Sequence, residues 1–118
     1  MSTSKKKTEV RKRSTLDDKV FERQAIICKA FAHPKRLKLM SMLSDGERRM
    51  SDLQRELGLS RANMSQHVTI LRGAGVVDTR RNGSHLYCFL AFPEVKQACQ
   101  LIHEVLRTQI RNQSKFGV

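Results

Sequence analysis

The residues between positions 60 and 71 combine hydrogen-bonding side chains with small ones at helical spacing. Met64, Val68 and Leu71 recur at i, i+4 and i+7 and predict the buried stripe of an amphipathic helix. An amide can bond adenine through two hydrogen bonds, arginine can do the same to guanine, and small residues let a helix approach the major groove. The pattern favours a helix that reads base edges, and a solvated face in an ordinary helical bundle is the alternative. The outward face carries Arg61, Ala62, Asn63, Ser65, Gln66 and Thr69.

This helix is expected to be the second of a closely spaced pair. Ser51 and Ser60 each lie three residues before an amide side chain, so each can cap the start of a helix. Gly58 can adopt the left-handed geometry that ends the first helix, and one residue separates it from Ser60. This is the spacing of a helix-turn-helix motif.

The segment after Gly75 changes from a helical to an extended pattern. Two β-prone runs flank Asn82-Gly83, which is a strong signal for a β-hairpin, and a hairpin directly after such a helix is a wing. Arg80, Arg81 and His85 are expected near its tip, where they can reach phosphates or the neighbouring minor groove. A small sheet with an incidentally basic turn is the alternative.

Two further helices are expected before this motif. Residues 16–32 carry apolar side chains at helical spacing. Pro34 fits the first position of a second helix, whose Leu37, Met40 and Leu43 are expected to point inward. We expect His33 to be a linker or cap residue rather than a ligand, and residues 47–50 to form a loop.

A last, long helix is expected to open at Pro93. Its apolar stripe, which runs from Val95 to Ile110, is larger than a small winged core requires. We therefore expect the first and last helices to form a homodimer interface, which would place two reading helices about one DNA turn apart on an inverted-repeat site. The predicted fold is mainly α with a small β-hairpin: a winged helix-turn-helix of about five helices and a two-stranded wing.

The composition indicates a polyanion as partner. The chain has 118 residues and a net charge of +12. Residues 1–15 carry +5 of this charge and are expected to be a disordered basic arm, because they lack apolar side chains. That leaves +7 on residues 16–118, the expected DNA-binding and dimerisation domain. The arm could contact phosphates or the minor groove, or could merely add solubility.

The same sequence gives expectations about cellular location. No apolar run has the length of a membrane span, and the N-terminus has no hydrophobic region of the signal-peptide kind, so a cytoplasmic protein without a membrane partner is expected.

Three cysteines without close pair spacing predict reduced thiols rather than a disulfide framework.

Several segments, taken in order and at their spacing, resemble the ArsR/SmtB family of small winged-helix repressors. The resemblance runs from about Lys29 to Leu90 and implies a homodimer that represses transcription and releases double-stranded operator DNA when an effector binds. Its operator-reading positions fall on residues 60–63, 65 and 66, and it implies a packed, structural place for His67. The carrying segments are Phe31-Ala32-His33-Pro34, Glu56-Leu57-Gly58-Leu59-Ser60, Met64-Ser65-Gln66-His67-Val68, Gly75-Val76-Val77 and Arg80-Arg81.

The chain departs from this family where its metal-sensing members carry a Cys-x-Cys motif. Arg49 and Ser51 occupy those positions, and neither can be a thiolate ligand. Cys99 and His103 share one helical face and Cys28 lies on the first helix, so a thiol- or metal-responsive repressor that uses these three residues is an alternative. Buried, inert thiols are the simpler interpretation, and we expect no metal site and no cofactor. The effector is left open.

The sequence argues against two other functional classes, a protein-interaction module and an enzyme. A winged helix can serve as a protein-interaction module whose basic surface meets an acidic partner, but the amide-rich helix face and the basic wing argue against it. An enzyme is not expected, because no paired carboxylates, activated nucleophile or glycine-rich phosphate loop occurs at usable spacing.

Overall fold

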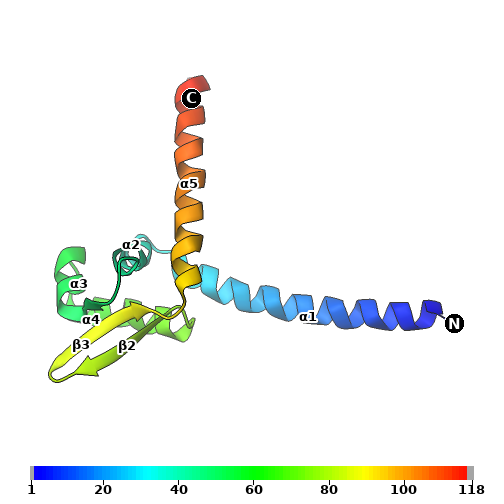
Figure 1. Ribbon diagram of the computed structural model, residues 1–118, viewed down its shortest axis with the longest axis horizontal. Coiled ribbons are helices and arrows are strands. Elements are labelled where there is room, and N and C mark those ends of the chain that lie inside the picture. The colour runs from blue at the N-terminus through cyan, green and yellow to red at the C-terminus, as the bar shows by residue number, and fades with distance from the viewer. Residues whose placement is uncertain (1, 117–118) are drawn as a thin grey trace.

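The protein is a small winged helix-turn-helix body from which two long helices project (Figure 1). The computed structural model describes the backbone of residues 2–116 and the side chains of residues 17–113. Over that range the fold is mainly α with a small antiparallel sheet, which confirms the predicted class. The elements are α1 Ser2–Phe31, α2 Pro34–Leu43, β1 Arg48–Arg49, α3 Met50–Leu57, α4 Arg61–Gly73, β2 Val77–Asn82, β3 His85–Leu90 and α5 Pro93–Phe116.

Helix α2 begins as its proline predicts. Pro34 occupies the first turn, and the Nδ1 atom of His33 accepts a hydrogen bond from the backbone N–H of Lys35 at 3.1 Å, so His33 is the N-cap. The prediction that Leu37 points inward is wrong. Leu39 is buried with Met40 and Leu43, whereas Leu37 is exposed.

The helix-turn-helix pair is capped at one of its two expected positions. Ser60 caps α4, because its Oγ atom accepts from the backbone N–H of Asn63 at 3.1 Å. Gly58 has a φ of 66° and ends α3 in the left-handed conformation. The predicted Ser51 cap is wrong: α3 begins at Met50, its N-cap residue is Arg49, and no side chain caps it.

The sheet has three strands in the order β1-β3-β2, where only a two-stranded wing was expected. The two-residue strand β1 pairs with β3, so part of the expected 47–50 loop is a strand. In the wing Asn82 pairs with His85, which makes Gly83-Ser84 the connecting residues instead of Asn82-Gly83. Gly83 has a φ of 63°, which favours glycine in this tight turn.

The core lies where α2, α3 and α4 meet the inner face of the sheet. The predicted inward residues of α4, Met64, Val68 and Leu71, are all buried. Cys88 of β3 is fully buried among them. Together with Leu39, Leu53 and Leu57, they pack α4 against the body.

Helices α1 and α5 extend away from this core in different directions (Figure 1). The radius of gyration is 19.5 Å, against about 13 to 14 Å for a compact chain of this length. Helix α1 begins at Ser2, whereas we expected a disordered arm before residue 16; no glycine or proline interrupts residues 2–15, so nothing local breaks the helix. The division into arm and domain stays a prediction. No helix in the described range is long and apolar enough to cross a membrane.

Candidate nucleic-acid interface

The outward face of α4 is open to solvent along its length. All six residues that the helical period placed there are exposed, as is Ser60 at its cap. The hydroxyl of Thr69 donates to the backbone carbonyl of Ser65 at 2.8 Å, which leaves its methyl group and an oxygen lone pair on the surface. The exposed amides of Asn63 and Gln66 remain available as donors and acceptors, and the guanidinium of Arg61 remains available as a donor.

A groove of about 480 Å³ joins this helix to α3 and to the wing. Arg61 and Ser65 line it from α4, and Arg81 and His85 line it from the wing, so the structure brings together predicted residues from two separate elements. The opposite wall is formed by residues that the sequence analysis did not propose as DNA contacts. They are Arg49, Ser51 and Gln54.

The pairing of strand β1 with β3 positions these additional residues. Arg49 pairs with Tyr87 of β3, and this pairing brings the start of α3 against the base of the wing. A two-residue strand has no period that a sequence pattern can show. The one available signal was the pair Arg48-Arg49 directly before a helix, at a position where a basic side chain can meet phosphate.

Arg80 and Arg81 are neighbours in β2 but lie on opposite faces of the hairpin. Arg80 forms an ion pair with Glu47 through two hydrogen bonds and lies 4.9 Å from the centre of the Tyr87 ring. The ion pair lowers the pKa of Glu47 and raises that of Arg80 through a direct hydrogen bond. Arg81 takes part in none of the ion pairs found among residues 17–113, and it faces the groove.

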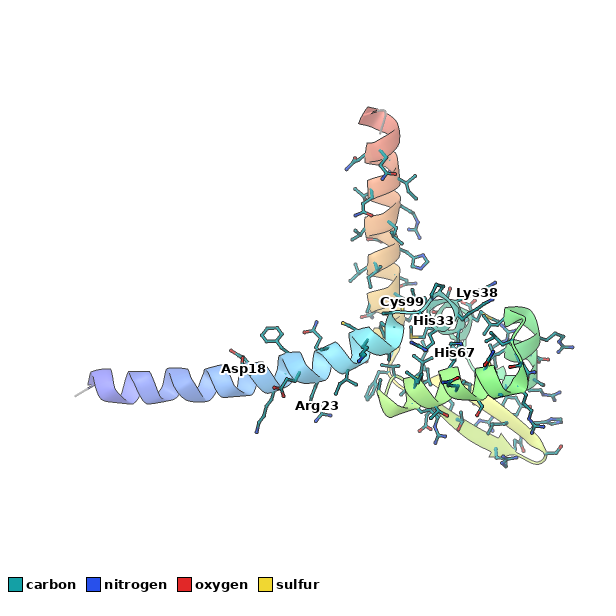
Figure 2. The ribbon with its side chains drawn as sticks, turned by 180° about the vertical axis from the view of Figure 1, so that it is seen from behind. Asp18, Arg23, His33, Lys38, His67 and Cys99 are labelled. Carbon is teal, nitrogen blue, oxygen red and sulfur yellow. The ribbon has the colours of Figure 1, made fainter. Side chains whose placement is uncertain are left out.

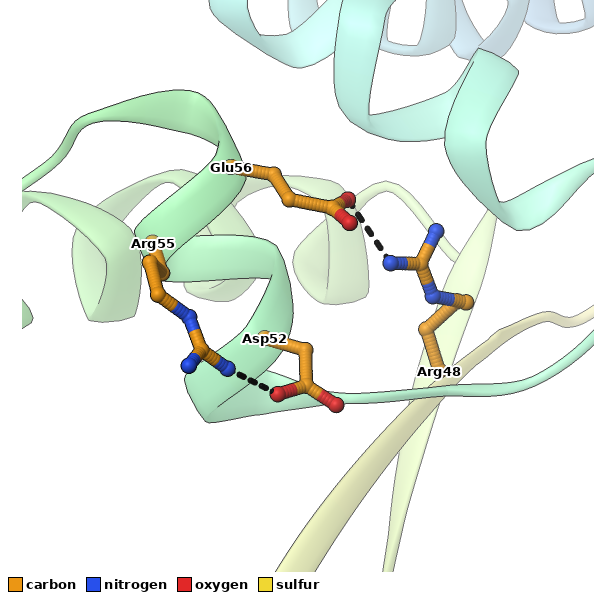
Figure 3. A network of polar contacts seen from close by, with 4 residues as sticks. All are labelled: Arg48, Asp52, Arg55 and Glu56. Carbon is orange, nitrogen blue, oxygen red and sulfur yellow. Dashed lines mark hydrogen bonds and ion pairs between the residues drawn. The ribbon is translucent and has the colours of Figure 1, made fainter.

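Ion pairs fix the elements that form the walls of the groove. Arg48 of β1 bonds Glu56 of α3 at 2.7 Å, and Arg55 pairs with Asp52 within α3 (Figure 3). Arg49, Arg61 and Arg81, which line the groove, take part in none of the four ion pairs of residues 17–113, so the groove stays positive.

The cysteines occupy three different environments. Cys28 is exposed, Cys88 is buried, and Cys99 is half-buried in a second groove that His103 also lines. Burial raises the pKa of the Cys99 thiol, and it raises that of Cys88 to about 11. Within the part of the chain that the structure describes, no group of three or more His, Cys, Asp or Glu side chains could hold a metal ion.

Comparison with known proteins agrees with this geometry. Residues 33–79 match the model of the bacterial regulatory protein, arsR family. A segment of 80 residues is 35% identical to the transcriptional activator HlyU of Vibrio cholerae and covers 68% of this chain and 74% of that protein. A segment of 81 residues is 33% identical to the biofilm growth-associated repressor of Agrobacterium fabrum and covers 69% of each.

A solved structure shows the same architecture. It is the solution structure of a homodimeric winged helix-turn-helix DNA-binding domain from Mycobacterium bovis, with a TM-score of 0.76 and 24% identity over 81% of this chain and 89% of that one. The matched segment contains α2, the helix-turn-helix pair and the start of the wing, so it includes the α3 and α4 walls of the groove and ends before Arg81 and His85. The chain therefore belongs to the arsR family of bacterial regulatory proteins, and it is a winged helix-turn-helix transcriptional regulator.

Proposed function

We propose that this regulator is a cytoplasmic repressor that binds an inverted-repeat operator as a homodimer and excludes the transcription machinery from the promoter. The observation that carries the proposal is the exposed outward face of α4, with its arginine and two amides, beside a groove lined by further basic residues. A surface of this kind can bond base edges and phosphates at the same time.

The residues divide into two roles. On α4, Arg61 is suited to guanine, and Asn63 and Gln66 are suited to adenine. Ala62, Ser65 and Thr69 allow the helix to approach closely, and Ser60 can donate its hydroxyl to a phosphate while its oxygen caps the helix. The wing residues Arg80, Arg81 and His85 are proposed to contact the backbone, with Arg49 as a further phosphate contact from α3.

The homodimer is supported by apolar side chains that the protomer leaves uncovered. Phe21 of α1 and Leu101, Val105 and Ile110 of α5 are each more than half exposed. Uncovered apolar side chains on two projecting helices are typical of an interface between subunits. The related Mycobacterium bovis domain is itself homodimeric.

The proposal can be tested by selecting duplexes from a random library with the full chain and measuring their binding by fluorescence anisotropy. Arg61→Ala is expected to weaken binding and relax the sequence choice at one position. Arg81→Ala is expected to weaken binding to all duplexes and to reduce the slope of log Kd against log salt by about 1. Lys38→Ala, which removes the same charge from α2, is the control and is expected to change neither.

The readout of repression is transcription in vitro from a promoter that carries the selected duplex. Selection of an inverted repeat together with reduced transcription would support the proposal. Tight binding to an acidic protein without any preference among duplexes would overturn it in favour of an interaction module. Increased transcription would show that the chain is an activator.

A further inference from the structure

The first turn of α2 joins the ends of the other helices of the body. The Nζ atom of Lys35 donates to the carbonyl of Leu57, the last residue of α3, at 2.9 Å. The Nε atom of Arg36 donates to the carbonyl of Ala30, one residue before the end of α1. Both carbonyls lie at helix C-termini, which leave acceptors unsatisfied and carry partial negative charge. These two cations therefore tie α1 and α3 to α2.

The same turn contacts the recognition helix through His67. The guanidinium of Arg36 lies 3.1 Å from Nδ1 of His67, and the centres of the His33 and His67 rings are 4.6 Å apart (Figure 2). His67 is half-buried on the inner side of α4, next to the outward residue Gln66. We name His33, Lys35, Arg36 and His67 the helix junction.

The hydrogen bonds of the helix junction require neutral rings. A guanidinium can only donate, so Nδ1 of His67 must accept and cannot carry a proton. The same holds for Nδ1 of His33, which accepts from the backbone N–H of Lys35. Protonation of His67 would therefore remove its bond to Arg36 and turn an attraction into a contact between two cations.

Among residues 17–113, the charged and titratable groups that act on His67 are all basic. They are His33, Arg36 and Lys35, so no carboxylate in this range offsets a charge on the ring. Burial, followed by these three groups, lowers the pKa of His67 below its ordinary value of 6.5. The ring is thus neutral at pH 7.5 and becomes charged only in more acidic solution.

We propose that His67 is a positioning residue that holds α4 against α2 only while its ring is neutral, so that acidification releases the helix and weakens DNA binding. This inference rests on the proposed function, because it assigns regulation to the same recognition helix. Recognition residues must be held within about 0.5 Å of their productive geometry, and Asn63 and Gln66 depend on the orientation of α4. The junction also contacts α1, so the same bonds connect α4 to a helix of the proposed dimer interface.

The expected loss of DNA affinity in acid is opposite to the change that charge attraction alone would produce. Added protons on a basic protein strengthen its attraction to DNA. A loss of affinity in acid therefore identifies the positioning effect. The two effects can be separated by variants at His67 alone.

The test is the Kd of the full chain for its selected duplex, measured by anisotropy from pH 7.5 to pH 5 at constant ionic strength. The wild-type Kd is expected to rise roughly tenfold, the change that one unit of pKa difference between free and bound protein produces. His67→Gln keeps an oxygen that accepts from Arg36 but does not titrate, so it should bind normally at pH 7.5 and lose no affinity in acid. His67→Ala should bind weakly throughout, and His103→Gln on α5 is the control that should behave as wild type.

A wild-type Kd that stays constant or falls in acid overturns the proposal, as does the same rise in His67→Gln. A second measurement does not depend on DNA: the histidine and amide chemical shifts of the free protein are followed over the same pH range. The amide signals of Asn63 and Gln66 are expected to move with the titration of His67. If no duplex binds at pH 7.5, the proposed function fails. If the amide signals of α4 do not move while His67 titrates, this inference fails separately.

Discussion

At the scale of single residues, adjacent side chains of one strand have different partners. Arg80 is held by Glu47 and by the ring of Tyr87, whereas Arg81 faces the groove beside α4. Glu47 balances the charge of Arg80 and accepts from two of its five N–H donors, so the attraction of Arg80 to a phosphate is weakened. Arg81 is therefore the better phosphate contact of the two, and Arg80 contributes to the extent that DNA displaces Glu47.

Replacement of Glu47 tests this competition. Glu47→Gln removes the ion pair and frees Arg80, so the affinity for all duplexes is expected to rise and the slope of log Kd against log salt to steepen by about 1. The matched control is Asp45→Asn, because Asp45 lies on the same loop and belongs to none of the ion pairs of the described residues. Anisotropy over a salt series measures both variants, and equal effects would show that only net charge matters.

The sequence predicted most of the candidate site because its residues lie on one helix. The 3.6-residue period of Met64, Val68 and Leu71 fixes which side chains of α4 face outward, and all of them are exposed. Arg49 and Gln54 were missed, because their place beside the wing depends on pairing between β1 and β3. Residues 48 and 88 pair across forty positions, and no local pattern predicts such a contact.

At the scale of the elements, the two serines of the helix-turn-helix have unequal roles. Ser60 caps α4, whereas Ser51 lies inside α3, which begins directly after β1. Ser60→Ala is therefore expected to lower the free energy of unfolding by about 1 kcal/mol. Ser51→Ala should change it by less than about 0.5 kcal/mol. Urea unfolding measures both, and equal losses would contradict the assigned cap.

The wing turn depends on a residue that tolerates positive φ. Gly83 has a φ of 63° and open space around it, so Gly83→Ala meets no steric neighbour but forces alanine into the left-handed region, at a cost of about 1 to 2 kcal/mol. Gly73→Ala in the last turn of α4 is the control, because Gly73 lacks positive φ and the substitution should raise stability by about 0.4 to 1 kcal/mol. Thermal unfolding should shift in opposite directions, and a shared direction would contradict this account.

Local sequence signals predicted the first residues of the helices more accurately than they predicted which face of each helix is buried. Pro34 and Ser60 were identified correctly, because a proline at the first turn and a serine cap act within a few residues. The prediction that Leu37 points inward is wrong, and Leu39 is buried instead. Helix α2 is apolar at both positions, and its neighbours α3 and α4 determine which side faces the core. The sequence did not predict that α1 begins at Ser2, because low apolar content favours disorder; the division into arm and domain stays a prediction.

At the scale of the whole molecule, charge and apolar surface are separated. The basic groove lies on the body with α4 and the wing, and most of the exposed large apolar side chains of residues 17–113 lie on α1 and α5. This separation lets one surface meet DNA while the other meets a second subunit. The helix junction connects the two, because Arg36 bonds both the end of α1 and His67 of α4.

The proposed dimer can be tested on the apolar stripe of α5, which consists of Leu101, Ile102, Val105, Leu106 and Ile110. Val105 is 57% exposed in the protomer, so Val105→Glu should leave the protomer folded by circular dichroism but place a buried charge in the interface. We expect wild type to sediment as a dimer and Val105→Glu as a monomer of 13.6 kDa.

The same variant separates dimerisation from the contacts of each recognition helix. Val105→Glu should bind a duplex with two half-sites no more tightly than a duplex with one. A second half-site increases the affinity only when the two subunits are linked. Gln97→Glu adds the same charge to an exposed position of α5 outside the stripe and is expected to remain dimeric with wild-type affinity. A Val105→Glu protein that still sediments as a dimer would place the subunit interface on another surface, and the inverted-repeat geometry would then have to be derived from that surface.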